Sequence, residues 1–137
     1  MARAKKTHTA ELVKVSAEFP ALIDAMEAEI QALSYSMARL DKAGRIYASE
    51  HWRKGKDGEP KYFYLLYVQK PGEARKREYI GCDLRKIKKA RAAIKRGREY
   101  DELRTKLLEL EDRIYHVQHA MSEARRYLTS ERRSYSY

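Results

Sequence analysis

Apolar residues recur with a heptad period in two separate stretches of the chain. In the first stretch they alternate between spacings of four and three residues, through Phe19, Ile23, Met26, Ile30, Leu33, Met37 and Leu40. The second stretch repeats that alternation through Leu103, Leu107, Leu110, Ile114, Val117, Met121, Ala124 and Leu128. Such a seam is typical of a helix that packs along another helix. We therefore predict two long helices that pair antiparallel within one chain, with Leu33 near Leu110 and Leu40 opposite Leu103.

The start of the first helix has two interpretations. Pro20 is tolerated if it lies in the first turn, or it marks a kink after a shorter helix that begins near Thr9. Gly44 is a natural end for this helix, because glycine is common just after the last helical residue.

Between the two seams the pattern changes to that of a β-sheet. Aromatic and branched residues are dense in one segment, and Pro71-Gly72 and Asp57-Gly58 are turn signals on either side of it. The three expected strands are residues 45–53, 62–68 and 75–80. Asp83 is a plausible N-cap for a helix that follows the third strand.

These elements predict an α+β fold, in which two long helices form an antiparallel coiled-coil stalk and a small three-stranded antiparallel β-sheet is inserted between them. The expected segments are a basic N-terminal tail (1–10), a first stalk helix (11–42), a basic sheet-plus-helix head (43–98), a second stalk helix (99–128) and a C-terminal tail (129–137).

Composition narrows the class of protein. The longest apolar run, residues 62–68, is far shorter than the ~18–20 residues that a membrane-spanning helix needs. No apolar stretch follows the basic N-terminus, so we expect no secretory signal. The single cysteine, Cys82, excludes an internal disulfide and a cysteine-rich zinc module. We expect a cytoplasmic protein.

The net charge of +10 is concentrated in the middle of the chain. Residues 43–98 hold 17 bases against six acids, whereas 11–42 and 99–124 carry net charges of −3 and −4. A surface that is charged only for solubility would interleave the two signs. This distribution therefore favours a polyanionic partner for the head.

The most basic segment is the helix that follows the strands. Residues 85–98 hold eight bases and no acid. On a helical wheel, Leu84, Ile87 and Ile94 share one arc and the bases form a ridge on the other, which consists of Arg85, Lys88, Lys89, Lys95 and Arg96. Such a ridge suits the phosphates of a nucleic acid. The alternative is a solvated helix face.

The second and third strands add aromatic residues to this basic region. With a four-residue Pro-Gly turn, Tyr64 pairs with Tyr79, Leu66 with Arg77 and Val68 with Arg75 on one face. Phe63 with Ile80, and Leu65 with Glu78, then lie on the other face and cover Leu84, Ile87 and Ile94. The outward residues suit stacking on bases and pairing with phosphates, and they are Tyr62, Tyr64, Tyr79, Arg75 and Arg77.

A tyrosine-rich core is the alternative for these residues, because a change of one residue in loop length would reverse the two faces. Arg53 and Lys54, from the first strand, complete the predicted nucleic-acid-binding set.

Nothing in the sequence predicts catalysis. Cys82 and His51 lack a third orienting group, and His116 and His119 lack a firm set of further metal ligands. No phosphate-binding glycine loop is present in the sequence. We expect no enzymatic activity, no metal, no cofactor and no small-molecule substrate.

Residues 45–96, with three expected strands and a helix, resemble the arm-type DNA-binding domain of phage and transposon integrases. That resemblance implies a sheet that enters the major groove. A chain of 137 residues cannot hold the integrase catalytic domain as well.

The Tyr-rich hairpin and basic helix also resemble a group of small mobile-element proteins, many of which carry a Gly-Lys-Pro-Gly-Cys-x-Cys stretch before the hairpin. The corresponding segment here, residues 52–60, has no cysteine, so a metal role is not carried over.

The sequence thus predicts a non-enzymatic, DNA-binding accessory, regulatory or architectural protein of a phage, plasmid or mobile element, which forms a homodimer through its stalk. Two alternatives stay open. The basic head docks on an acidic protein, such as a nucleic-acid enzyme that it inhibits, or it binds RNA.

Overall fold

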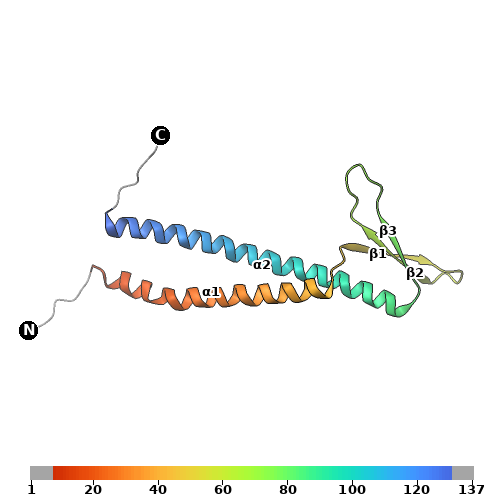
Figure 1. Cartoon of the computed structure of the whole chain (residues 1–137), viewed down its shortest axis with the longest axis horizontal. Helices are drawn as coiled ribbons and strands as arrows, with labels where there is room; N and C mark the ends of the chain where they lie inside the picture. The colour runs from red at the N-terminus through yellow and green to blue at the C-terminus, as the bar shows by residue number, and fades with distance from the viewer. Residues whose placement is uncertain (1–7, 131–137) are drawn as a thin grey trace, which may run out of the picture. The chain divides into compact units, whose positions relative to one another are not determined.

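The computed structural model describes residues 8–130 and has the predicted α+β architecture (Figure 1). Along the chain, one helix precedes and one helix follows a three-stranded antiparallel sheet. In chain order the elements are α1 (Ala10–Ala43), β1 (Ala48–Lys54), β2 (Pro60–Tyr67), β3 (Arg77–Gly81) and α2 (Leu84–Thr129). Among the described residues, no helix is both long enough and apolar enough to cross a membrane.

The chain divides into two compact units. The stalk unit contains residues up to Ser34 together with those from Lys106 onward, and the head unit runs from Tyr35 to Thr105. The head unit therefore includes the last turns of α1 and a longer part of α2 than the predicted head of 43–98. Most of the predicted N-terminal tail and all but two residues of the C-terminal tail lie outside the described residues.

In the stalk unit, α1 and α2 run alongside each other in opposite directions (Figure 1). Among its described residues, Leu33 and Leu110 are the two buried apolar side chains, 9% and 3% exposed. They belong to the two predicted seams and were expected to lie near each other. Burial decreases toward the start of α1, where Phe19 is 37% and Leu12 is 57% exposed.

The contrast between buried and exposed leucines of α2 gives a stability prediction. Leu110→Ala removes a buried side chain, and we expect it to lower the free energy of unfolding by about 2–4 kcal/mol. Leu108→Ala is the matched control, because Leu108 lies outside the seam, is 54% exposed and should change stability by no more than about 0.5 kcal/mol. Urea denaturation followed by circular dichroism measures the free energy of unfolding of both variants. Equal losses in the two variants would contradict the prediction that the seam is the packed face of α2.

Pro20 lies inside α1, because that helix begins at Ala10. The interpretation of Pro20 as a first-turn residue is therefore wrong. The expected start of helix near Thr9 is confirmed, since the Val13 amide donates to the Thr9 carbonyl.

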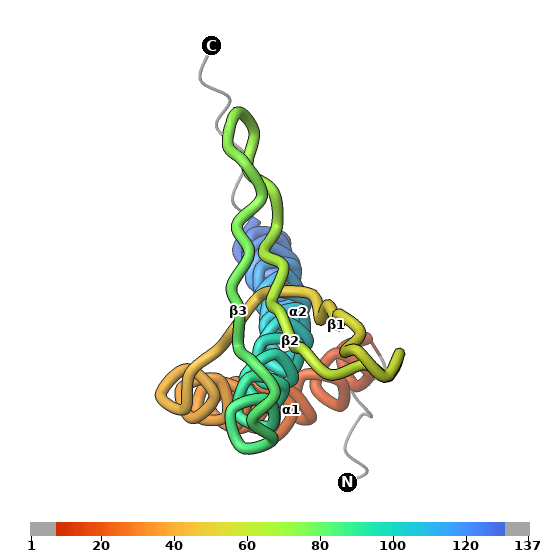
Figure 2. The backbone as a smooth tube through the Cα atoms, turned by 90° about the vertical axis from the view of Figure 1, so that its right-hand side faces the viewer, coloured from red at the N-terminus to blue at the C-terminus, as the bar shows by residue number. Residues whose placement is uncertain are grey.

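The two turns of the sheet follow the glycine and proline signals. The Glu73 amide donates to the Lys70 carbonyl over 3.1 Å, which closes a four-residue turn around Pro71-Gly72. Gly72 has φ +78°, a conformation that glycine adopts without strain. Residues 68–76 are all exposed, and Figure 2 shows this β2–β3 loop projecting from the head unit.

The register of β2 with β3 confirms three of the five predicted pairs. Tyr64 pairs with Tyr79, Leu65 with Glu78 and Leu66 with Arg77. The predicted pair of Phe63 with Ile80 is wrong, because a bulge shifts the register and Phe63 pairs with Gly81. The extra residue in the bulge, Ile80, packs against the core. The ladder ends at Leu66 with Arg77, so the predicted pair of Val68 with Arg75 does not form.

The core of the head unit lies between the sheet and α2, as predicted. Its buried members are Phe63, Leu65, Ile87, Ala90 and Ile94. The structure corrects the prediction for Leu84, which is 80% exposed because it is the first residue of α2. The Asp83 carboxylate accepts the Arg85 amide over 3.0 Å, so Asp83 is the N-cap that the sequence predicted.

Glycine at position 97 allows the segment after α1 to approach α2. A Cβ atom on Gly97 would lie 3.0 Å from the Ile46 carbonyl oxygen and 3.3 Å from the Tyr47 ring. The Ile46 amide also donates to the Ala93 carbonyl over 3.1 Å. The chain therefore leaves α1 in direct contact with α2, and this contact sets where β1 begins.

Arg45 fixes the same junction through its side chain. Its guanidinium donates to Asp41 Oδ1 over 2.6 Å and to Tyr47 Oη over 2.8 Å, and Cζ lies 3.7 Å from the centroid of the Tyr100 ring. The hydrogen bond with Asp41 is the main cause that raises the pKa of Arg45. Arg45 is thus fully engaged within the head unit.

Candidate nucleic-acid interface

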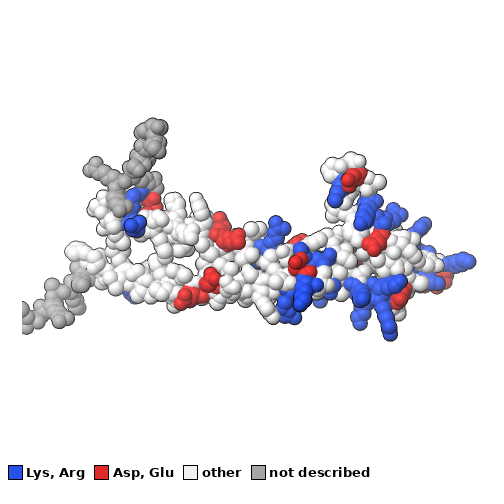
Figure 3. Space-filling view, in the orientation of Figure 1, with Lys and Arg blue, Asp and Glu red and all other residues white. Residues whose placement is uncertain are grey.

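Lys and Arg side chains cover much of the head unit (Figure 3). Four members of the predicted ridge, Arg85, Lys88, Lys89 and Lys95, are exposed. The fifth, Arg96, is half-buried, and its Nε donates to the Gly44 carbonyl over 2.6 Å. Carbonyl groups at a helix end lack partners within the helix, so Arg96 caps the end of α1.

A groove of about 820 Å³ runs between β1 and α2. Four cations from α2 line it, and they lie on one helix face because they are spaced three, four and three residues apart. These cations are Lys88, Arg91, Lys95 and Arg98. Its apolar lining consists of Trp52, Leu84, Ile87, Ala92 and Ile94. We call this feature the cationic groove.

The charge of the cationic groove is almost entirely positive. Glu50 is its one acidic lining residue, and Glu50 Oε1 lies 2.7 Å from Arg91 Nε. Lys88, Lys95 and Arg98 have no acidic partner among residues 8–130. Three exposed cations are therefore available to an anionic ligand.

Trp52 stands in the wall of the groove. Its ring meets the Phe63 ring edge-on, with centroids 4.9 Å apart and an angle of 68° between the planes. The residue remains 38% exposed, so the core holds the indole in place without covering it. An aromatic ring beside unpaired cations is a typical stacking site for a base.

Sequence reasoning missed Trp52, Arg91 and Arg98 as site residues. The spacing of Lys88, Arg91, Lys95 and Arg98 is visible in the sequence, and a count by helical face would have found it. Trp52 also had a signal, because Ile46, Ala48 and Trp52 share one face of the strand expected for residues 45–53, and Ile46 and Ala48 pack on the core.

A second surface lies on the opposite side of the sheet. Side chains alternate along a strand, so Tyr62 and Tyr64 face away from the core that holds Phe63 and Leu65. The Tyr64 and Tyr79 rings have centroids 4.9 Å apart, and His51 lies 6.1 Å from Tyr64. We call Tyr62, Tyr64, Tyr79 and His51, with Arg53 and Arg77 from the flanking strands, the tyrosine face.

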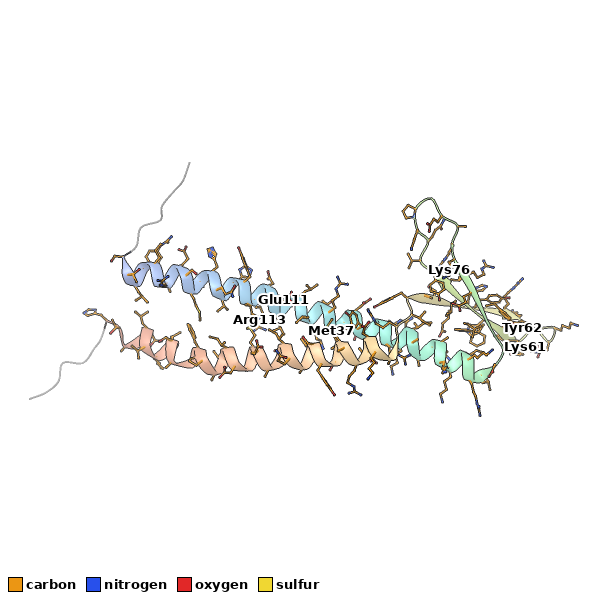
Figure 4. All side chains as sticks on the ribbon, in the orientation of Figure 1. Met37, Lys61, Tyr62, Lys76, Glu111 and Arg113 are labelled. Atoms are coloured by element: carbon orange, nitrogen blue, oxygen red, sulfur yellow. The ribbon has the colours of Figure 1, made fainter. Side chains whose placement is uncertain are left out.

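Tyr79 is the most open ring of the tyrosine face, at 56% exposed. Reduced access to water, followed by the nearby Cys82 thiol, raises the pKa of Tyr79. This ring therefore stays neutral at physiological pH and can stack or donate a hydrogen bond. Lys61 Nζ lies 5.7 Å from the Tyr62 ring centroid at the start of β2 (Figure 4).

Two remaining predicted residues occupy the ends of the sheet. Lys54 is exposed at the end of β1. Arg75 Nε donates to the Tyr67 carbonyl over 3.0 Å, so Arg75 braces the base of the β2–β3 loop. Lys76, beside it, lies with Nζ 5.0 Å from the Tyr67 ring centroid (Figure 4). The predicted residues thus do not form one surface, because some lie on α2, others lie on the tyrosine face across the sheet, and Lys54 and Arg75 lie at the ends of the sheet.

The Tyr67–Glu78 pair predicts a pH dependence of stability. Tyr67 Oη donates to Glu78 Oε2 over 2.6 Å, which raises the pKa of Tyr67 from 10.0 to about 12. The pKa of Tyr67 is higher in the folded protein than in the unfolded chain, so protonated Tyr67 stabilises the folded state. This stabilisation is complete below pH 10.0 and is lost as the pH rises toward about 12.

We expect the difference in unfolding free energy between the parent and Tyr67→Phe to be constant from pH 7 to 9 and to shrink toward pH 12. Urea denaturation at each pH measures this difference. A difference that does not vary with pH would contradict the hydrogen bond.

Within residues 8–130, no three histidine, cysteine, aspartate or glutamate side chains lie together as a metal site requires. Cys82, the single cysteine, is exposed. No family model, curated protein or solved structure matches this chain.

Proposed function

We propose that this chain is a non-enzymatic DNA-binding protein whose head unit holds the nucleic acid. The observation that carries the proposal is the cationic groove, in which Lys88, Lys95 and Arg98 lack acidic partners among the described residues and flank the exposed Trp52. Like charges on one helix face repel one another, and no ion pair among the described residues compensates the charge of Lys88, Lys95 or Arg98. The phosphates of a nucleic acid would supply the compensating negative charge, and their binding would release counterions from the nucleic acid.

Two further observations support the proposal. The tyrosine face adds stacking rings beside Arg53 and Arg77. The resemblance of residues 45–96 to the arm-type DNA-binding domain of integrases also supports the proposal. We propose an accessory, regulatory or architectural role in a phage, plasmid or mobile element, in the cytoplasm.

The test is the salt dependence of binding by the full chain. Labelled duplex DNA, single-stranded DNA and RNA of one sequence are titrated by fluorescence anisotropy at several salt concentrations, with polyglutamate as the acidic polypeptide control. We expect DNA to bind with a steep negative slope of log K against log salt, about −0.9 per phosphate contact on duplex. Preference for polyglutamate would favour the alternative in which the head docks on an acidic protein. Preference for RNA would favour the alternative in which the head binds RNA.

We also infer that two copies of the chain associate through the stalk unit. Seam residues that α1 and α2 leave uncovered support this inference, because Ile23, Met121 and Leu128 are 49%, 37% and 76% exposed. A second pair of helices would cover such a stripe. Sedimentation equilibrium should give a dimer for the parent and a monomer for Ile23→Asp. A monomeric parent at every concentration would contradict the inference.

A further inference from the structure

The cationic groove is built for a narrow strand. From Lys88 to Arg98 the groove follows ten residues of α2, which is about 15 Å of helix. Its volume of about 820 Å³ lies within the range of small-ligand pockets, about 300–1,000 Å³. A few nucleotides of one strand match these dimensions.

The position of Trp52 distinguishes a single strand from a duplex. In a duplex each base is covered on both faces by its neighbours, so an aromatic side chain reaches a base face only when that base is unstacked. Trp52 is held edge-on by Phe63 and is 38% exposed. Phosphate contacts alone would not require an exposed indole at this place.

The apolar lining agrees with that assignment. Leu84 is 80% exposed at the start of α2, and Ala92 lies among the four cations of the groove. Apolar side chains beside cations fit sugars and bases beside phosphates. A carboxylate-rich protein segment would leave Trp52 and Leu84 without a specific contact.

We propose that the cationic groove binds single-stranded DNA, with Trp52 stacked on an unpaired base and Lys88, Lys95 and Arg98 on neighbouring phosphates. The inference rests on the proposed function and adds the strandedness of the ligand and the residues that select it. The tyrosine face, on the other side of the sheet, is not part of this site.

Trp52 is the single tryptophan of the chain, so its fluorescence reports on this groove alone. The full chain is titrated with single-stranded DNA and with a duplex of the same length and sequence. We expect single-stranded DNA to quench Trp52 and the duplex to leave it nearly unchanged. Single-stranded RNA is a third arm, and quenching by RNA without DNA would overturn the assignment of DNA.

Two triple variants, each of which removes three positive charges, test where on the head unit the single-stranded DNA binds. The groove variant replaces Lys88, Lys95 and Arg98 with alanine, and the control replaces the exposed residues Arg85, Lys86 and Lys89, none of which lines the groove. We expect the groove variant to bind single-stranded DNA at least about tenfold more weakly than the parent. Its slope of log K against log salt should be less steep by about 2. The control should retain most of both.

Trp52→Phe tests the stacking step, because phenylalanine keeps an aromatic ring against Phe63. We expect a loss of roughly threefold to tenfold in affinity for single-stranded DNA, measured by anisotropy, and no change for duplex. Circular dichroism confirms that each variant is folded.

The outcomes separate this inference from the proposed function. If the duplex quenches Trp52 equally, or the two triple variants lose equal affinity, the groove is not a single-strand site although DNA binding stands. If none of the oligonucleotides binds, the proposed function fails as well.

Discussion

Replacing Arg85, Lys88, Lys89 and Lys95 together with alanine is expected to weaken the binding of duplex DNA by at least about a hundredfold at low salt. All four side chains are exposed on the first turns of α2 and none belongs to the core. Each phosphate contact that is lost should flatten the salt slope on duplex DNA by about 0.9, or about 3.6 for four contacts. The measurement is anisotropy across a salt series, with the melting temperature recorded for each protein.

The melting temperature should barely change, because exposed substitutions alter stability by no more than about 0.5 kcal/mol each. Arg96 is left unchanged in this variant, since its hydrogen bond to the Gly44 carbonyl joins α2 to the end of α1. Its replacement would mix a folding defect with a binding defect. If the quadruple variant binds as the parent does, the ridge is only a solvated face, and the acidic-protein alternative gains support.

Phe63→Ala is expected to destabilise the head unit by about 3–5 kcal/mol. Phe63 is fully buried in the head core, so its replacement with alanine leaves a cavity that the surrounding side chains fill only in part. The change also removes the ring against which Trp52 packs. Trp52 emission should therefore shift to longer wavelength well before the helices melt.

Val68→Ala is the matched control for this prediction, since Val68 follows β2 and is 77% exposed. It should leave stability within about 0.5 kcal/mol of the parent. Urea denaturation followed by Trp52 fluorescence and by circular dichroism measures both variants. Equal stability of Phe63→Ala and the parent would contradict the assignment of Phe63 as the centre of the head core.

The helices and the sheet were predictable because each has a short-range pattern. A heptad seam requires only that one stripe of a helix be covered, and Leu33 and Leu110 satisfy it. The Pro71-Gly72 turn sets the register next to it, which explains why Tyr64 was correctly paired with Tyr79.

The remaining features depend on contacts between distant segments. The bulge at Ile80 forms where β3 turns into α2, and no local signal marks it. The role of Arg96 follows from the approach of α1 to α2 at Gly97, which brings residues 44 and 96 together. The cationic groove likewise exists only once β1 lies beside α2, so its lining could not be assembled from either segment alone.

The two outer strands of the sheet, β1 and β3, each have one unpaired edge among the described residues, because each pairs only with β2. Unpaired strand edges invite other chains to add to the sheet, which leads to aggregation. Strand β1 is seven residues long, carries Glu50, Arg53 and Lys54, and loses its regular register at its last residue. Strand β3 is five residues long, begins with Arg77 and Glu78, and also has an irregular register with β2. A short, charged and irregular edge is a poor template for a further strand. The head can therefore remain dispersed at high concentration although both edges of its sheet are open.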